Sequence, residues 1–228
     1  TPERMYDEKG TNVIRKYFGD KSYEFTIKDA LGTINPLTGK PFLNPYYYYP
    51  VFVDLNTAER NDYVEITKKI IYLMSLDDVD ESDINLQRIL RANILKNAKM
   101  KIDEVENLIL KIDGKEKIKD TIIFATEEQA EKVLSMLGSH GITRCKITEH
   151  ESTTKKLGSS GLSEREEYIN QFRKGNVQVL LGLKCLDEGI DIKNARIAIL
   201  LASSTNPREY VQRIGRVIRP DKNKKFSE

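Results

Sequence analysis

The stretch YVQRIGRVIRP, residues 210–220, spaces three arginines three residues apart among valines and isoleucines. On a helix, at about 100° per residue, Gln212, Arg216 and Arg219 fall at i, i+4 and i+7 and share one narrow stripe. A different face gathers the residues that can pack on a core: Val211, Ile214, Gly215 and Ile218. The stretch therefore predicts a short amphipathic helix that displays one amide and two guanidinium groups in a row.

The flanking residues predict where this helix starts and stops. Asn206 can cap it, Pro207 suits the first helical position, and Glu209 lies three residues past the cap. Pro220 ends the helix because proline has no amide hydrogen to donate. Arg213 lies one turn after Glu209, so we expect an ordinary ion pair between them.

Length and composition indicate one large globular domain or two small ones. The 228 residues include 39% hydrophobic and 32% charged side chains, and the net charge of +2 gives no support to nucleic-acid binding by bulk electrostatics. Two cysteines and two histidines without a C-x-x-C argue against a zinc site and suit a reducing cytoplasm. No apolar run approaches the ~20 residues that span a bilayer. We expect a cytoplasmic protein without a membrane partner, and we expect Thr1 to be the cut edge of a longer chain.

Beyond the charged turn at residues 113–119, apolar strands and amphipathic helices alternate. The predicted strands cover residues 121–125, 144–148, 177–182 and 195–202, and helices are predicted at residues 127–137 and from Ser163 to Phe172. Such alternation predicts a parallel sheet with helices on both faces. Ligands of such sheets gather at the carboxyl ends of the strands.

Residues 1–118 are less regular. A capped helix is predicted from Asn56 to Leu73 and an uninterrupted helix from Ser82 to about Ile112. We interpret the basic residues of the second helix as a solvated face, with contact to a duplex as the alternative: Arg88, Arg91, Lys96, Lys99 and Lys101. The aromatic run PYYYYPVFVDL, residues 45–55, predicts a strand with one packed face. A base-stacking surface is the alternative for that run.

A second informative stretch is LLGLKCLDEGIDI, residues 180–192, in which a buried strand runs into an acidic loop. Asp187, Glu188 and Asp191 flank Gly189, which lets the backbone approach a ligand. The carboxylates can accept hydrogen bonds from hydroxyl or guanidinium groups. A solvated acidic turn is the alternative.

Several segments together resemble a known family. TIIFA (121–125) resembles motif IV of superfamily 2 helicases and translocases, LKCLDEGIDI (183–192) resembles motif V, and QRIGRVIR (212–219) matches the motif VI pattern Q-x-x-G-R-x-x-R in full. The opening TPER resembles the end of motif III, and residues 16–31 and 45–59 are similar to the linker of motor subunits in restriction and DNA-repair helicases. The resemblance implies a C-terminal RecA-like domain at residues 119–228. A mostly helical linker or accessory region at residues 1–118 would precede it.

The resemblance also implies a nucleotide site. The arginine stripe would face the terminal phosphate of ATP held by another RecA-like domain, with Arg216 and Arg219 as arginine fingers and Gln212 adding polar contacts. Three motif V residues would lie on the nucleotide side: Glu188, Gly189 and Asp191. Asp191 would be the partner of the ribose or of an arginine.

Nucleic-acid contacts are implied for Thr126, Arg165 and Lys184. For Arg165, a surface ion pair with Glu164 stays open as the alternative. Motif V departs from the family pattern here, because Leu183 and Lys184 stand where a threonine usually precedes the glycine. The hydroxyl contact to the backbone is thus absent, and a lysine that can contact phosphate takes its place.

No phosphate-binding loop G-x-x-x-x-G-K-[ST] occurs in the sequence. DESD, residues 80–83, fits an acidic-box pattern but follows MSLDDV rather than an apolar strand, so we interpret it as a helix start and predict no metal site. ATP and Mg²⁺ would be bound mainly by the N-terminal RecA-like domain of the same polypeptide, and the 228-residue chain would be inactive alone.

The leading hypothesis is that the chain is the second motor domain of an ATP-dependent DNA helicase or translocase of restriction or repair. The alternative is a non-motor DNA- or protein-binding module on the same scaffold.

Overall fold

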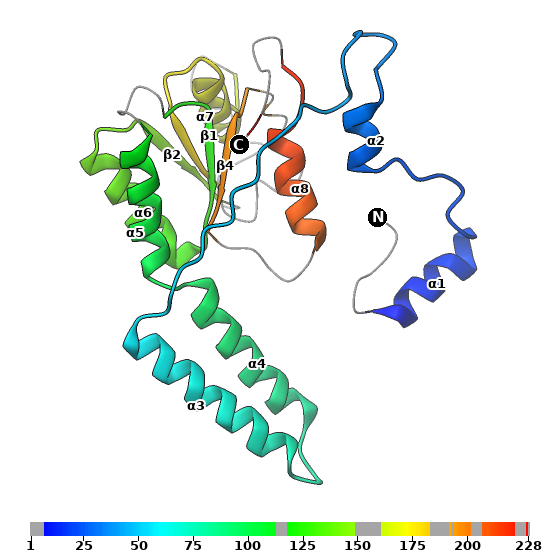
Figure 1. Ribbon diagram of the computed structural model, residues 1–228, viewed down its shortest axis with the longest axis vertical. Helices are drawn as coiled ribbons and strands as arrows, with labels where there is room; N and C mark the ends of the chain where they lie inside the picture. The colour runs from blue at the N-terminus through cyan, green and yellow to red at the C-terminus, as the bar shows by residue number, and fades with distance from the viewer. Residues whose placement is uncertain are drawn as a thin grey trace. The chain divides into compact units, whose positions relative to one another are not determined.

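A computed structural model of the chain describes residues 7–112, 118–148, 161–182, 192, 194–201, 207–221 and 227 (Figure 1). Its contacts divide the chain into two compact units. Residues 1–49, 186–198 and 203–228 form the first unit, and residues 50–185 and 199–202 form the second. The boundary between residues 118 and 119 that the sequence suggests stays a prediction.

In the described residues, four short strands build one sheet. β1 (Thr121–Phe124), β2 (Arg144–Ile147), β3 (Val179–Gly182) and β4 (Ile197–Leu200) lie in the order β2-β3-β1-β4. β3 pairs in parallel with both of its neighbours, with Val179 opposite Thr121 on one side and opposite Arg144 on the other. Parallel neighbours need crossover connections, and the helices α6 (Glu127–Ser139) and α7 (Glu164–Arg173) lie in two of them. The predicted parallel α/β sheet is confirmed.

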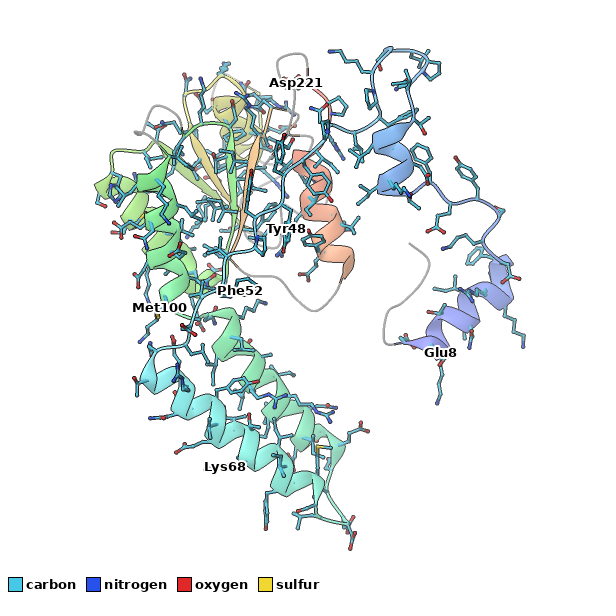
Figure 2. All side chains as sticks on the ribbon, in the orientation of Figure 1. Glu8, Tyr48, Phe52, Lys68, Met100 and Asp221 are labelled. Atoms are coloured by element: carbon cyan, nitrogen blue, oxygen red, sulfur yellow. The ribbon has the colours of Figure 1, made fainter. Side chains whose placement is uncertain are left out.

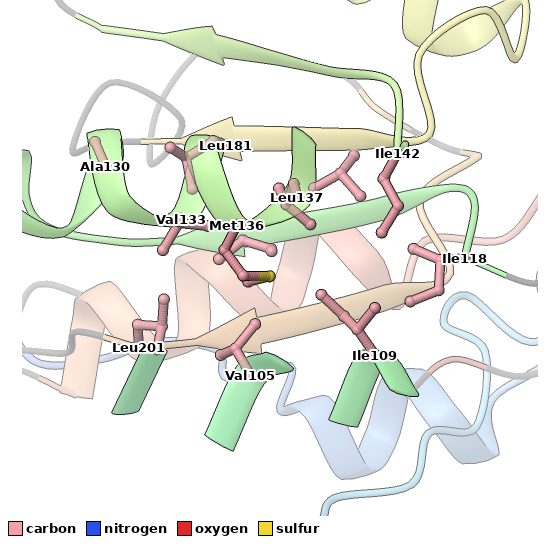
Figure 3. Close-up of a cluster of buried hydrophobic side chains, with 12 residues drawn as sticks. Val105, Ile109, Ile118, Ala130, Val133, Met136, Leu137, Ile142, Leu181 and Leu201 are labelled. Atoms are coloured by element: carbon pink, nitrogen blue, oxygen red, sulfur yellow. The ribbon is translucent and has the colours of Figure 1, made fainter. Parts of the chain in front are cut away.

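The main core lies between the sheet and two helices. Val105 and Ile109 of α5 (Met100–Lys111) point toward Val133, Met136 and Leu137 of α6 in one apolar cluster (Figure 3). The cluster also contains Ile123 of β1 and Leu181 of β3. Side chains alternate along a strand, so the neighbouring residues point to the opposite face of the sheet: Ile122, Phe124 and Leu180. These are at most 1% exposed, so both faces of the sheet are covered, as predicted.

The remaining helices are α1 (Glu8–Phe18), α2 (Ile27–Gly32), α3 (Thr57–Met74), α4 (Glu81–Lys96) and α8 (Pro207–Val217). Local capping explains several of their starts. Asn56 and Glu59 form a capping box at α3, and Ser163 and Glu166 form one at α7. Each of these boxes satisfies two amides that would otherwise lack a helical partner. α3 and α4 pack on each other along their length (Figure 1).

The uninterrupted helix predicted from Ser82 to Ile112 is wrong. The first part begins at Glu81, with Asp80 as its cap, and ends at Lys96, and a new helix starts at Met100. In a continuous helix the carbonyl of Lys96 would accept the amide of residue 100. Here that carbonyl accepts from Gln129 Nε2 at 3.0 Å and from Lys101 Nζ at 3.2 Å. Tertiary hydrogen bonds therefore replace the helical one and break the helix.

The strand predicted for residues 45–55 is also wrong. Only Tyr46 makes an isolated bridge, to Ser227, and the rest of the run pairs with no strand in the described part of the chain. Tyr47, Tyr48 and Tyr49 are 56%, 62% and 67% exposed. Strand propensity alone does not form a strand where no neighbouring edge accepts it. The alternative of a base-stacking surface therefore remains open.

The core position of Leu137 yields a stability prediction. Leu137 is 0% exposed in the cluster of α5, α6 and the sheet. We expect Leu137→Ala to lower the free energy of unfolding by about 2–5 kcal/mol, because the substitution removes buried methyl groups and leaves a cavity. Urea denaturation measures this. Leu110 on α5 is 61% exposed, so Leu110→Ala serves as the control with a change within about 0.5 kcal/mol. Equal effects of the two substitutions would contradict the assignment of the core.

Candidate functional site

The arginine-bearing stretch forms helix α8, which begins at Pro207 as predicted and ends at Val217, three residues before Pro220. The predicted cap Asn206 lies outside the described residues. Glu209 and Arg213 form the predicted ion pair, with Glu209 Oε2 and Arg213 Nη2 3.4 Å apart. Arg213 is only 6% exposed, so the arginine side of this pair is buried.

The buried face of α8 differs in rotation from the predicted one. Arg213, Ile214, Val217 and Ile218 are buried, whereas Val211, predicted to face the core, is 45% exposed. At about 100° per residue, the buried positions centre on the side opposite the predicted stripe. The stripe residues are partly exposed: Gln212, Arg216 and Arg219. Only Gln212 and Arg216 lie on α8, because the helix ends at Val217, two residues before Arg219. The rotation therefore turns the stripe away from the buried side, and the arginines divide into one buried and two accessible.

Two segments outside the helix hold the carboxyl end of α8. The amide of Asn44 donates to the carbonyl of Ile218 at 2.8 Å, and Ser227 Oγ donates to the carbonyl of Val217 at 2.8 Å. These bonds satisfy carbonyls that a helix end leaves without partners. Tyr48 lies against this helix (Figure 2), with its ring edge-on to Tyr210 at 6.3 Å between centroids. The run of tyrosines thus helps to fix the helix that carries the arginines.

Motif V is largely outside the described residues. Lys184, Glu188, Gly189 and Asp191 all lie there, together with Leu183 and Asp187. The described strand β3 leads up to the motif and is buried from Val179 to its last residue, Gly182. The assignments of Glu188, Gly189, Asp191 and Lys184 stay predictions.

Thr126, predicted to contact nucleic acid, is the N-cap of α6 directly after β1. Its hydroxyl accepts from the amide of Gln129 at 3.3 Å and donates to Asn97 Oδ1 at 2.7 Å. The hydroxyl therefore has a structural role whether or not it also meets a ligand.

Arg165 lies in the first turn of α7 and is half-buried. Its neighbour Glu164, the alternative ion-pair partner, accepts a hydrogen bond from the hydroxyl of Tyr168 at 3.0 Å. The predicted nucleic-acid contact of Arg165 stays a prediction.

Sequence reasoning missed a polar junction at the end of β1, made by Asn97, Thr126, Gln129 and Lys101. Lys101 Nζ donates to the carbonyl of Leu201 at 2.9 Å as well as to that of Lys96. Burial lowers the pKa of Lys101, and the nearby charge of Lys96 lowers it further. The interpretation of Lys101 as part of a solvated face is therefore wrong. The only signal in the sequence is an asparagine inside an otherwise helical pattern, which does not reveal its partners.

Within the described residues, no group of three or more histidine, cysteine, aspartate or glutamate side chains could hold a metal ion. No helix of the described chain is both long and apolar enough to cross a bilayer.

The parallel sheet with helices on both faces defines an α/β domain. Residues 100–221 match the family model of the helicase conserved C-terminal domain. This chain therefore belongs to the helicase C-terminal domain family, and the resemblance seen in the sequence is confirmed. The C-terminal part of the Fun30 ATPase domain shares the fold, with a TM-score of 0.59 at 12% identity over 81% of this chain and 84% of that one.

Two curated relatives share a quarter of their aligned residues with this chain. The chain is 25% identical to the DNA 3′-5′ translocase XPB2 of Sulfurisphaera tokodaii over 82% of its own length and 43% of the relative. It is 25% identical to UvrABC system protein B of Staphylococcus aureus over 76% of its length and 27% of the relative. The chain thus spans less than half of the length of these two relatives.

The junction at Thr126 yields a second prediction. We expect Thr126→Ala to lower the free energy of unfolding by about 1–2 kcal/mol, because α6 loses its cap and Asn97 loses a donor. Thr126→Ser keeps the hydroxyl and is the control, which should stay within about 0.5 kcal/mol of the parent. Urea denaturation of both variants gives the comparison. An alanine variant as stable as the parent would show that the junction contributes nothing.

The tyrosines beside α8 yield a prediction on pH. Burial raises the pKa of Tyr210, and the neighbouring phenols of Tyr48 and Tyr46 raise it further. A group whose pKa is raised by folding stabilises the folded state below its unfolded pKa, about 10 for tyrosine, and the contribution is lost as the pH rises through the folded pKa. We expect the stability to fall above about pH 10, and to fall less steeply in Tyr210→Phe. Thermal unfolding at increasing pH tests this, and parallel curves for the two proteins would refute it.

Proposed function

We propose that this chain is the second motor domain of an ATP-dependent superfamily 2 DNA helicase or translocase that acts in restriction or repair. The observation that carries the proposal is the rotation of α8. Arg213 is buried and ion-paired, while Arg216 and Gln212 are partly exposed on the side of the helix away from its buried face, and Arg219, two residues past the end of α8, is partly exposed as well.

The chemistry of the stripe suits the terminal phosphate of ATP. Hydrolysis of that phosphate spreads negative charge over its oxygens, and a planar guanidinium offers paired donors to such oxygens. Arg216 and Arg219 act as arginine fingers, and Gln212 adds a polar contact at their side. The ATP and Mg²⁺ are held mainly by the N-terminal RecA-like domain of the same polypeptide. The motif V residues Glu188, Gly189 and Asp191 link the nucleotide to the domain.

The proposed substrate is DNA. Support comes from the two relatives, which are named as a DNA translocase and as a component of the UvrABC system. Thr126 follows the carboxyl end of β1 and Lys184 follows that of β3, the edge where ligands of parallel sheets gather. With Arg165 they contact the backbone of the nucleic acid. Closure of the two motor domains on ATP and their opening after hydrolysis alternate the grip on the strand.

The test is ATP hydrolysis by the full-length polypeptide. We expect Arg216→Ala and Arg219→Ala each to lower kcat by about 10³–10⁵-fold, the effect of losing an arginine finger. The 228-residue chain alone is expected to hydrolyse no ATP. Full activity in both variants would refute the proposal, and DNA binding by a full-length protein without any ATPase would favour the non-motor binding module.

Two further arginines serve as controls for this experiment. Arg88 is exposed on α4, so Arg88→Ala is expected to keep both activity and stability. Arg213 is buried and paired, so Arg213→Ala is expected to lower the free energy of unfolding by roughly 2–4 kcal/mol. The urea midpoint of each variant separates loss of catalysis from loss of folding.

A further inference from the structure

The tyrosine run lies along α8 in an extended form that sorts its side chains. The amide of Tyr47 donates to the carbonyl of Ser227 at 2.9 Å, and the amide of Ser227 donates to the carbonyl of Pro45 at 3.0 Å. In an extended chain, alternate side chains point to opposite sides. The ring of Tyr48 lies edge-on to that of Tyr210, with 6.3 Å between the centroids, so Tyr48 and its alternate neighbour Tyr46 face the helix. Tyr47 and Tyr49 therefore face away from it.

The outward pair has the geometry of a stacking site. The rings of Tyr47 and Tyr49 are inclined by 24°, and their centroids are 6.3 Å apart. Stacked nucleic-acid bases repeat at about 3.4 Å, so a flat ring between two others needs roughly twice that spacing. The pair is close to this separation. More than half of each side chain is exposed, so a ligand can reach the rings.

We propose that Tyr47 and Tyr49 form a stacking site for an unpaired base of single-stranded DNA. The site rests on the proposed function, which supplies DNA as the substrate. Proteins that hold single strands use aromatic side chains in this way, because every base has a flat face to stack. The anchoring of the run to α8 ties the site to the helix of the arginine fingers.

The geometry favours a strand over the base of the ATP that those arginines serve. Tyr210, which Tyr48 contacts, lies on the buried side of α8 by helical spacing, close to Ile214 and Val217. Gln212 and Arg216 lie on the other side. The run that carries Tyr47 and Tyr49 therefore contacts α8 on the side that does not face the phosphate of ATP.

The test is binding of the 228-residue chain to a fluorescent oligo(dT) strand, compared with an abasic strand of the same length. We expect Tyr47→Ala/Tyr49→Ala to weaken oligo(dT) binding about tenfold, as expected for loss of base stacking, and to leave binding of the abasic strand unchanged. Alanine keeps the amide that Tyr47 donates to Ser227, so the run should stay anchored. Tyr47→Phe/Tyr49→Phe keeps both rings and should bind like the parent.

A matched control comes from α1. Tyr17 and Phe18 are 82% and 79% exposed, but their rings meet edge-on at 69°, which leaves no slot for a base. Tyr17→Ala/Phe18→Ala should therefore bind like the parent. The proposal is overturned if this control lowers binding as the Tyr47/Tyr49 variant is expected to do. It is also overturned if the abasic strand binds the parent as tightly as oligo(dT).

Photochemical cross-linking of the parent protein to a 5-iodouracil strand gives a readout that needs no variant. We expect the cross-link at Tyr47 or Tyr49. A cross-link confined to other residues overturns the proposal. So does a cross-link that disappears when ATP is added without competing DNA, because the rings would then hold the base of ATP. Failure of the stacking site and failure of the proposed function give different results. Base-dependent binding through the tyrosines without ATPase in the full-length protein would sink the motor assignment alone. ATPase that depends on Arg216 with no role for the tyrosines would sink the stacking site alone.

Discussion

The rotation of helix α8 about its own axis decides which of its arginines can reach a ligand. Arg213 and Arg216 are three residues apart, yet one is buried beside an ion-paired glutamate and the other is partly exposed. The burial of Ile214, Val217 and Ile218 sets that rotation, since exposing them would lose the hydrophobic free energy of three aliphatic side chains. Burial of the apolar residues of the motif therefore fixes the direction in which its arginines point. This explains why apolar and charged residues alternate within so short a stretch.

The elements that rest on local signals were predictable from the sequence. Ser163 with Glu166 and Asn56 with Glu59 bond within one turn, so three or four residues contain the whole cause of each helix start. The same holds for the alternation of buried strands and amphipathic helices that gives the parallel sheet. Helical spacing also separates Gln212 and Arg216 from the apolar residues, but it does not predict that α8 ends before Arg219 or that Val211 is exposed.

The features that depend on distant partners were not predictable. Apolar residues continue at helical spacing on both sides of Asn97, so nothing local marks the break between α4 and α5. Its cause is the bonding of Asn97 to Thr126 and of the Lys96 carbonyl to Gln129, which are 29 and 33 residues away. The tyrosine run shows the same limit, because its partner is Ser227 near the other end of the chain. Strand propensity describes what a segment can do, and the available neighbours decide what it does.

The junction at Lys101 has a mechanical consequence for the region before the sheet. Lys101 holds the last carbonyl of α4 and the carbonyl of Leu201, which follows β4, and Leu201 in turn donates its amide to the carbonyl of Phe124 at the end of β1. A half-buried ammonium loses hydration that only such carbonyls replace, so releasing either one is costly. The base of the α3–α4 pair is also held by Glu59, which accepts the amide of Lys99 at 3.0 Å. These bonds tie the base of the α3–α4 pair to the ends of β1 and β4, and the groups that make them stand where a continuous helix would otherwise run, which explains why the helix breaks at this point.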